Sequence, residues 1–417
     1  MIKNAKIIVI IPDGMADLKI DSLGGKTPMQ VANKPCMDFL AANGICGTVK
    51  TVPDGMTPES DTANLAILGY DPKVYSKGRA PLEAVSMGLL PQIGENDTAF
   101  RCNLVTLSED NNDYEDKIIT DHSADDIETD EADILIKEIN DKLGNDKIRF
   151  YTGLSYRHCL LWENRPELCG FTPPHDILTK KIAEYLPNGE YLSFMKESYN
   201  ILNNHPVNKK RREKNLNPAN SIWLWSPGGK YNLPQFKDKY NLDGSVISAV
   251  NLIKGLGICA GLDIIEVEGA TGNYHTNYKN KGFAAIDEIK KGKDFVFVHI
   301  EAPDECGHRG ETENKVSSIE KIDSMIISPI YDYLRNSGED FKIIVLPDHY
   351  TPISTRTHSG EPVPFLMYDS KNGDKSSGVD NFNEQSVSEK SNIFIKDGYK
   401  LLDLLCQNVG CDDLGTP

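Results

Sequence analysis

Two sets of acidic residues and histidines in this sequence have the spacing expected of ligands for divalent metal ions. In the segment APDECGH, Asp304 and His308 are four residues apart and directly follow an apolar run that predicts a strand. If the segment is helical, side chains at positions i and i+4 project from one face and can bind one ion. His358, in a later polar loop, completes a set of two histidines and one carboxylate. Such a set is typical of catalytic metals that keep open coordination positions.

The second set also follows predicted strands. Asp13 ends the segment KIIVIIPD, while Asp348 and His349 come just after IIVLP. Two ions a few ångströms apart can clamp a phosphoryl group and lower the pKa of a bound hydroxyl. Ser60 is the candidate for that hydroxyl, because a serine without an activating group is a poor nucleophile. Each motif alone is weak, since polar loops often contain isolated histidines. Three such motifs, each after a predicted strand, together favour a two-metal site for phosphoryl transfer.

Buried strands and the helices between them are expected to position these residues. The unbroken apolar run at 343–346 predicts a strand that is covered on both faces. In α/β proteins, ligands bind beyond the carboxyl ends of such strands. Residues 62–68 predict the start of a helix, which places Ser60 near a helix N-terminus, where backbone N–H groups favour anions.

Three further predictions follow from apolar patterns and turn residues. Residues 28–44 predict one helix that ends at Asn43 and Gly44. Residues 244–267 predict a helix followed by a strand, and the polar segment 370–391 predicts a loop. Strand and helix patterns therefore occur in both the first and the last part of the chain.

Composition excludes several classes of protein. The 417 residues predict two domains, and 39% hydrophobic residues suffice for a full core. No apolar run approaches the roughly 20 residues of a membrane span, and the run at 7–11 is too short for a signal peptide. Nine cysteines without CxxC pairing indicate free thiols in a reducing cytoplasm. The net charge of −17 disfavours nucleic acid or an anionic membrane as partner, and no feature specifies an oligomeric state.

Charge also divides the chain. Residues 109–146 are strongly acidic and predict a solvated surface helix, whereas residues 147–239 contain more basic than acidic residues. The simplest arrangement is one α/β domain built from residues 1–77 and 240–417, with residues 78–239 inserted as a second, smaller domain. An anionic ligand would prefer the basic part of this insertion, and active sites often form where two such bodies meet.

Long motifs in the sequence resemble those of the 2,3-bisphosphoglycerate-independent phosphoglycerate mutases of the archaeal type, within the alkaline phosphatase superfamily. These motifs are IPDGMAD, PESDTANLAILGYDP, VHIEAPDECGH and LPDHYTPISTRTHSGEPVPF, together with RAPLEA, FRCNLVT, YRHCLLW, PPHD and EGATGNYHTNY. The resemblance extends almost from end to end. It implies an alkaline-phosphatase-like domain, with a mixed sheet sandwiched by helices, and an inserted α/β transferase-like domain. It also implies a phosphoglycerate as the small-molecule substrate.

The resemblance implies roles for individual residues as well. Ser60 is similar to the serine that the family phosphorylates, and Lys254 to a lysine near the phosphoryl group, although by sequence alone Lys254 is a solvated helix lysine. One ion would be bound by Asp304, His308 and His358, and the other by Asp13, Asp348 and His349 with the Ser60 oxygen. Manganese is the expected metal, and this type of ligand set also accommodates magnesium, cobalt or zinc.

In the insertion, the resemblance points to residues that hold the substrate carboxylate and help proton transfer. These are Arg101, His122, Arg157 and one of Arg211 or Arg212. His158, beside Arg157, is either a substrate-binding residue or a packed core histidine. Many family members have glycine near Asp125, in the loop that follows His122.

The implied reaction interconverts 3-phosphoglycerate and 2-phosphoglycerate through a phosphoserine, with an insertion that closes and excludes water. A phosphatase with the same metals is one alternative, and a related phosphotransferase such as a homoserine kinase is another; substrate profiling would separate them. A sulfatase is disfavoured because Ser60 lacks a Cys-x-Pro-x-Arg setting. An inactive, metal-stabilised binding module is disfavoured because all seven residues of the two metal sets are present.

Overall fold

The computed structural model describes residues 5–110, 113–371 and 378–407. The chain divides into two units. Unit 1 comprises Met1–Ser76 and Asn232–Pro417, and unit 2 comprises Lys77–Tyr231. The boundaries expected from the sequence lie after residues 77 and 239, and the roles expected for the two domains stay predictions.

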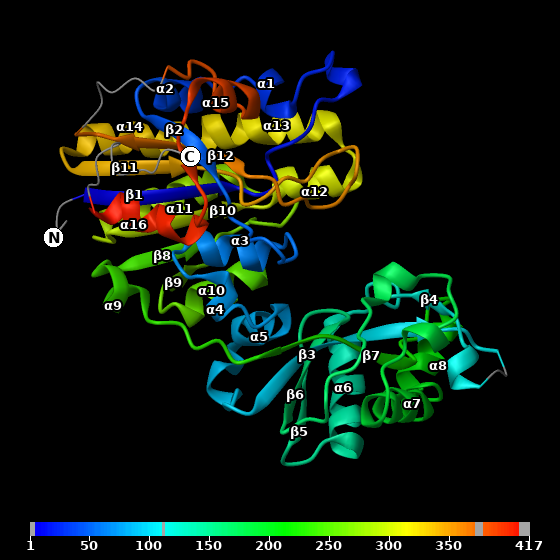
Figure 1. Ribbon diagram of the computed structural model, residues 1–417. Coiled ribbons are helices and arrows are strands. Elements are labelled where there is room, and N and C mark those ends of the chain that lie inside the picture. Colours follow the sequence, from blue (N-terminus) through cyan, green and yellow to red (C-terminus); the bar gives the residue numbers. More distant parts are fainter. Residues whose placement is uncertain (1–4, 111–112, 372–377, 408–417) are drawn as a thin grey trace. The chain divides into compact units, whose positions relative to one another are not determined.

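Unit 1 is built on an eight-stranded sheet with the order β13-β2-β12-β11-β1-β10-β8-β9 (Figure 1). Strands β1, β8, β9, β10 and β11 run parallel, whereas β12 is antiparallel to both β11 and β2. The carboxyl ends of β1, β10 and β11 therefore lie at the same edge of the sheet. The bounds are β1 Ala5–Pro12, β2 Ile45–Val49, β8 Gly244–Ile247, β9 Asp263–Ile265, β10 Phe295–Ile300, β11 Asp340–Val345, β12 Val363–Asp369 and β13 Phe394–Ile395.

Helices cover both faces of this sheet, as two neighbouring residues of β11 demonstrate. The ring of Phe341 packs against Tyr331 of α14, whereas Nζ of Lys342 donates a hydrogen bond to the carbonyl of Leu405 in α16. Successive side chains of a strand point to opposite faces, so α14 and α16 lie on opposite sides (Figure 1). The predicted mixed sheet sandwiched by helices is confirmed. The helices of unit 1 are α1 Pro28–Val31, α2 Pro35–Ala42, α3 Ser60–Ile67, α4 Pro72–Tyr75, α9 Phe236–Tyr240, α10 Asn251–Cys259, α11 Tyr278–Lys290, α12 Ala302–Arg309, α13 Thr312–Ile322, α14 Ser328–Ser337, α15 Glu384–Lys390 and α16 Leu401–Gln407.

Three local predictions for unit 1 are wrong. The segment 28–44 forms two helices, because Pro35 has no N–H and forces Lys34 out of the helical region, to φ −133° and ψ 59°. Residues 244–247 form the buried strand β8 instead of a helix, and α10 begins only at Asn251. Part of the predicted loop at 370–391 is helix α15, which starts where the Asn383 side chain accepts a hydrogen bond from the Ser386 N–H.

Unit 2 contains a five-stranded antiparallel sheet in which the long strand β3 pairs with β4, β6 and β7, and β5 pairs with β6. Its strands are β3 Asp97–Leu107, β4 Ile119–Asp121, β5 Ile148–Tyr151, β6 Arg157–Glu163 and β7 Ser221–Gly229. Its helices are α5 Arg79–Ala84, α6 Thr129–Leu143, α7 Glu190–Leu202 and α8 Pro206–Glu213.

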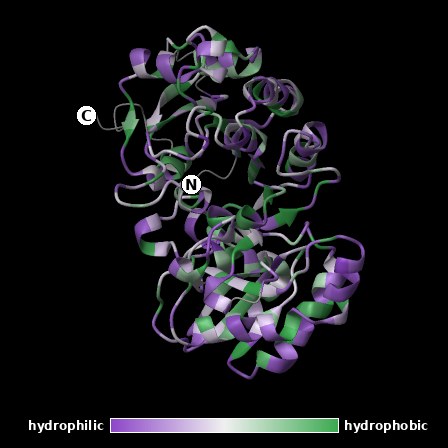
Figure 2. Ribbon diagram, turned by 90° about the vertical axis from the view of Figure 1, so that its right-hand side faces the viewer, coloured by the Kyte–Doolittle hydropathy of each residue, from purple (hydrophilic) through white to green (hydrophobic). Residues whose placement is uncertain are grey.

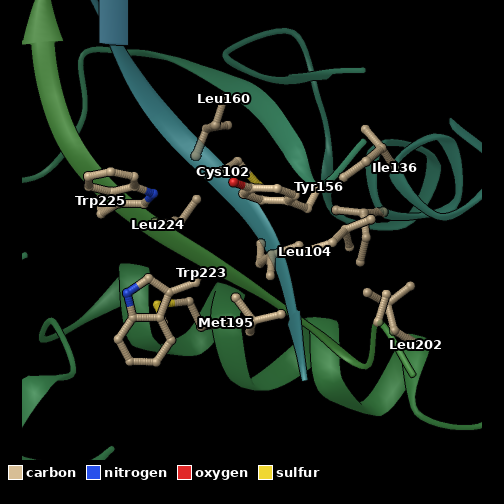
Figure 3. Close-up of a cluster of buried hydrophobic side chains, with 14 of the residues drawn as sticks. Cys102, Leu104, Ile136, Tyr156, Leu160, Met195, Leu202, Trp223, Leu224 and Trp225 are labelled. Carbon is tan, nitrogen blue, oxygen red and sulfur yellow. The ribbon is translucent and has the colours of Figure 1, made fainter. Parts of the chain in front are cut away.

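The core of unit 2 lies between this sheet and its helices (Figure 3). Met195 of α7 and Leu104 of β3 are fully buried there beside Trp223, whose indole N–H donates to the carbonyl of Thr172. The acidic helix α6 buries one stripe, with Ala132, Leu135, Ile136 and Ile139 at helical spacing. Its other residues are exposed or half-buried, and Figure 2 shows hydrophilic and hydrophobic positions alternating along the helices.

The structure bears on the predictions of free thiols and of no membrane span. The eight described cysteines are free thiols, and Cys411 lies outside the described residues. Among residues 5–110, 113–371 and 378–407, no helix is both long and apolar enough to span a membrane. The cytoplasmic location stays a prediction.

Candidate active site

Three segments that follow parallel strands of unit 1 place acids and histidines at one edge of the sheet. Asp13 comes directly after β1, helix α12 begins two residues after β10, and Asp348 and His349 follow β11. In the register of the sheet, Pro12 pairs with Ile300 and the two neighbouring strands end level with each other. The strand ends therefore bring together side chains that are more than 300 residues apart in the sequence.

The first group consists of Asp304, His308 and His358, whose ligand atoms lie within 4.8 Å of one another. Asp304 and His308 share one face of α12, as the i, i+4 spacing predicts. The two carboxylate oxygens of Asp304 lie 3.3 Å from His308 Nε2 and 3.3 Å from His358 Nε2. The hydrogen bond that His308 donates to the Asp304 carboxylate raises the pKa of His308 to about 9. Burial opposes the charged form of His358, but Asp304 still raises its pKa overall.

The hydrogen bonds of the Nδ1 atoms of His308 and His358 leave their Nε2 atoms to face Asp304. His308 Nδ1 lies 3.0 Å from the carbonyl of Arg356, and His358 Nδ1 lies 2.8 Å from the carbonyl of Pro58. A carbonyl only accepts, so both Nδ1 atoms donate, and each ring, when neutral, presents the lone pair of its Nε2 atom inward. Metal-binding histidines commonly donate their second N–H to a carbonyl in this way. The donor set therefore fits a divalent cation.

The second group consists of Asp13, Asp348 and His349, all buried. His349 Nε2 lies 3.6 Å from Asp13 Oδ1 and 3.5 Å from Asp348 Oδ2. Burial, together with the neighbouring Asp348 and Asp304 carboxylates, raises the pKa of Asp13 well above its usual range. Asp13 Oδ1 is buried without a hydrogen-bond partner among the described residues. Buried carboxylates that crowd each other in this way are stabilised by a bound cation.

Several neutral residues hold the second group in place. Asp348 Oδ1 accepts hydrogen bonds from the backbone N–H groups of Gly14 and His349, and Oδ2 accepts one from the Asn64 amide. The Thr351 hydroxyl donates to Asp304 at 2.6 Å and lies 3.2 Å from His349 Nδ1. Thr351 therefore connects the two groups. Sequence reasoning did not identify Asn64 or Thr351, although both lie inside motifs that contain site residues.

Ser60 lies at the edge of the second group. It is the first residue of α3, and its Oγ is 3.1 Å from His349 Nε2. The His349 ring also stacks on the His358 ring, with 3.9 Å between their centres. The serine hydroxyl and both groups therefore form one continuous site. Lys254, by contrast, forms an ion pair in which its Nζ lies 2.7 Å from each carboxylate oxygen of Glu266.

Unit 2 contains a separate cluster of cationic side chains. Arg101 Cζ lies 3.8 Å from the centre of the Trp225 ring, opposite it in the β3–β7 register, and Arg101 Nε pairs with Glu83 at 2.9 Å. Burial lowers the pKa of Arg101, Glu83 opposes this shift, and the charges of Arg79 and Arg157 add to it. Cations that destabilise one another in this way favour the binding of an anion.

Two histidines and a tyrosine continue the cluster. The His122 ring meets Tyr156 edge-on at 5.7 Å and lies 6.2 Å from the His175 ring, which in turn meets Trp225 at 5.4 Å. Arg157 Cζ lies 4.3 Å from the Tyr156 ring. The structure thus brings Arg101, His122 and Arg157 together. Sequence reasoning missed His175, Tyr156 and Glu83 as site residues, even though they lie in the PPHD, YRHCLLW and RAPLEA motifs.

The loop after His122 has an unusual backbone. Ala124, Asp125 and Asp126 have φ of 50°, 55° and 49°. This left-handed region favours glycine, in agreement with the glycine that the resemblance places near Asp125. The Asp121 carboxylate stabilises the loop because it accepts hydrogen bonds from the N–H groups of Ser123 and Asp125.

The other insertion candidates make contacts typical of structural residues. Arg211 is buried and donates to Glu131 and to the carbonyls of Ala124 and Asn217. Arg212 donates to Glu109 and to both oxygens of Asn203. His158 is buried, accepts a hydrogen bond from the Gly153 N–H, and has a pKa lowered by burial to about 3. These contacts favour a packed core histidine over a substrate-binding one.

Comparison with known proteins places the whole chain in one family. The family described as 2,3-bisphosphoglycerate-independent phosphoglycerate mutase matches residues 41–208. A protein of that name from Methanosarcina barkeri is 49% identical over 396 residues, which cover 94% of this chain and 97% of the relative. A cofactor-independent phosphoglycerate mutase from Thermoplasma acidophilum is similar in structure, with a TM-score of 0.64 and 28% identity over 97% of this chain and all of that one. A Pyrococcus horikoshii protein gives a TM-score of 0.78 at 29% identity, covering 97% and 98% of the two chains.

Proposed function

The chain belongs to the 2,3-bisphosphoglycerate-independent phosphoglycerate mutases, and we propose that it interconverts 3-phosphoglycerate and 2-phosphoglycerate through a phosphoserine at Ser60. One observation supports this assignment above the others. The Ser60 hydroxyl lies 3.1 Å from His349 Nε2, at the edge of a buried cluster of carboxylates and imidazoles. A hydroxyl in this setting has the surroundings that a nucleophile for phosphoryl transfer needs.

We propose that two divalent ions are part of the enzyme. Asp304, His308 and His358 would hold one, and Asp13, Asp348, His349 and the Ser60 oxygen the other. When bound, the ions would lower the pKa of the serine hydroxyl and neutralise charge on the transferring group. Manganese is the expected metal, and the mixed imidazole and carboxylate donors also accommodate magnesium, cobalt or zinc.

The residues of unit 1 would carry the phosphoryl group. Ser60 Oγ loses its proton and attacks the phosphorus of 3-phosphoglycerate, the bond to O3 breaks, and O3 takes up a proton. Glycerate and phosphoserine result. In the second half, O2 of glycerate loses its proton and attacks the phosphoserine, which releases 2-phosphoglycerate and restores the serine. Lys254 would stabilise negative charge in this reaction, and it would first have to exchange its present partner Glu266.

Unit 2 would bind the glycerate part of the substrate. The guanidinium groups of Arg101 and Arg157 lie over the rings of Trp225 and Tyr156, and a guanidinium group can bind a carboxylate through two N–H groups. Arg101 would bind the substrate through the N–H groups other than Nε, which is paired with Glu83. His122, between Tyr156 and His175, is the candidate base for the glycerate hydroxyl. Arg211, Arg212 and His158 would serve mainly to stabilise the unit.

A single assay tests the proposal. Purified enzyme would be incubated with 3-phosphoglycerate and manganese, without 2,3-bisphosphoglycerate, and 2-phosphoglycerate would be detected with enolase. We expect steady formation of 2-phosphoglycerate. Release of inorganic phosphate in its place would identify a phosphatase, and no turnover with phosphoglycerate but activity with another phosphorylated metabolite would identify a different phosphotransferase.

A further inference from the structure

Three buried polar residues, Ser248, His299 and Asp13, form a line across neighbouring strands. Ser248 follows β8, His299 lies in β10 and Asp13 follows β1, and these strands are adjacent in the sheet. All three side chains are almost completely buried, and His299 is fully inaccessible. A buried histidine in a central strand is costly unless its nitrogens have polar partners. Both of its nitrogens point along this line.

The hydrogen bonds along this line all point the same way, from Val250 through Ser248 to His299. The Val250 N–H, which can only donate, points at Ser248 Oγ at 3.0 Å. The Ser248 hydroxyl proton is then available for His299 Nδ1, which lies 3.3 Å away. A neutral imidazole that accepts at Nδ1 carries its proton on Nε2. That nitrogen is buried, has no hydrogen-bond partner among the described residues and lies 3.0 Å from Asp13 Oδ2, so its proton is available to this oxygen.

The two oxygens of Asp13 therefore face different neighbours. Oδ2 faces His299, whereas Oδ1 lies 3.6 Å from His349 Nε2 on the side of the second group. If a neighbouring side chain holds one oxygen of a metal-binding carboxylate, the carboxylate cannot rotate freely, and its other oxygen stays directed at the metal site. Residues that orient metal ligands in this way commonly change the metal affinity ten- to a hundredfold when they are removed.

We propose that His299, fixed by Ser248, is a positioning residue that holds Asp13 Oδ2 so that Oδ1 stays directed at the ion bound with Asp348 and His349. Lys281 supports this arrangement from α11, because its buried Nζ donates to the His299 carbonyl at 3.0 Å. The inference rests on the proposed metal set of Asp13, Asp348 and His349. It adds a residue whose role is specific to one of the two ions.

The test uses two variants that each keep only one of the two metal sites. His358→Ala leaves the ion at Asp13, and Asp13→Ala leaves the ion at Asp304 and His308. His299→Leu would be added to each, and the Mn²⁺ dissociation constant measured by the electron paramagnetic resonance signal of free Mn²⁺. We expect His299→Leu to raise the constant about tenfold or more in the His358→Ala background. In the Asp13→Ala background, the matched control, we expect a change of less than about twofold.

Two milder variants keep the test valid if His299→Leu fails to fold, which thermal unfolding in EDTA would reveal. His299→Gln places an amide N–H near Asp13 and should restore most of the affinity, whereas Ser248→Ala should weaken it several-fold. Equal effects of these changes in both backgrounds, or no effect in either, would overturn the inference. Unchanged binding stoichiometry in Asp13→Ala would instead overturn the metal assignment itself, and the inference with it.

Discussion

His308 Nε2 and His358 Nε2 lie 2.9 Å apart, although each imidazole donates its Nδ1 proton to a backbone carbonyl on the outside. Two lone pairs at this distance repel each other unless a proton or a metal ion lies between them. Asp304 contacts both nitrogens and adds negative charge at the same point. The raised pKa of His308, about 9, supplies that proton when no metal is bound, and a divalent cation at the first group would take its place.

The first prediction is that the enzyme depends on divalent metal. A chelator should abolish turnover of 3-phosphoglycerate, and added manganese should restore it, because the buried carboxylates and the facing imidazoles need a cation. His358→Ala should lose one of two bound ions and Asp13→Ala the other, as measured by elemental analysis. Full activity in enzyme shown to be free of metal would contradict the assignment.

The second prediction concerns Arg157, which is exposed beside Tyr156 in unit 2. Arg157→Ala should reduce kcat/KM for 3-phosphoglycerate roughly tenfold or more, because a charge-assisted contact to the substrate carboxylate is lost. Metal content and melting temperature should stay as in the wild type. The matched control is Arg335→Ala, which removes another exposed arginine, on α14 in unit 1. Kinetics of Arg157→Ala that equal those of the control would show that Arg157 does not bind substrate.

Arg211 should behave in the opposite way, which is the third prediction. Its side chain is 2% exposed and pairs with Glu131, so Arg211→Ala leaves a carboxylate without its partner. Loss of one member of a buried pair costs about 3–5 kcal/mol, and because Glu131 is 29% exposed we expect the lower end of that range. Urea unfolding would measure the loss. A stable Arg211→Ala enzyme with a strongly raised KM would instead favour the substrate-binding role.

The fourth prediction is a pH dependence due to His158. Burial lowers its pKa to about 3 in the folded protein, whereas in the unfolded chain it protonates near pH 6.5. The unfolded state therefore binds more protons below pH 6.5, and the stability that His158 contributes is lost as the pH falls from 6.5 towards 3. The full effect is on the order of a few kcal/mol.

A variant isolates this effect from other titrating groups. His158→Asn keeps an acceptor for the Gly153 N–H but cannot protonate, so the stability difference between wild type and variant should shrink as the pH is lowered from 7 to 4. Urea unfolding at each pH would give that difference. A difference that stays constant over this range would mean that His158 is not the buried neutral group described here.

The metal groups were accessible from the sequence because each motif follows a buried strand, and parallel strands bring their carboxyl ends to one edge. Asp13, Asp304 and Asp348 could therefore be grouped without knowledge of the tertiary structure. The cluster in unit 2 was only partly accessible. Trp225 meets Arg101 through the β3–β7 register, and that long-range pairing leaves no local pattern.

Charge patterns gave less reliable predictions than strand ends. The acidic stretch 109–146 predicts a solvated surface helix, yet Glu131 within it pairs with the buried Arg211. The excess of basic residues in 147–239 predicts that an anionic ligand binds there, and the resemblance implies this role for one of Arg211 or Arg212, whereas both guanidinium groups contact carboxylates of unit 2. A run of like charges cannot reveal which members have partners from distant parts of the chain.

The last prediction decides between a mutase and a phosphatase, and it concerns Ser60. If Ser60 carries the phosphoryl group, Ser60→Ala should reduce mutase activity on the order of a thousandfold or more. Ser324→Ala, which removes an exposed helix hydroxyl, is the control and should leave the rate unchanged. The wild-type enzyme should convert 3-phosphoglycerate with labelled phosphate into 2-phosphoglycerate that keeps the label, with little free phosphate. Free phosphate released as fast as substrate disappears would mean that water, and not glycerate, receives the group, and that the chain is a hydrolase.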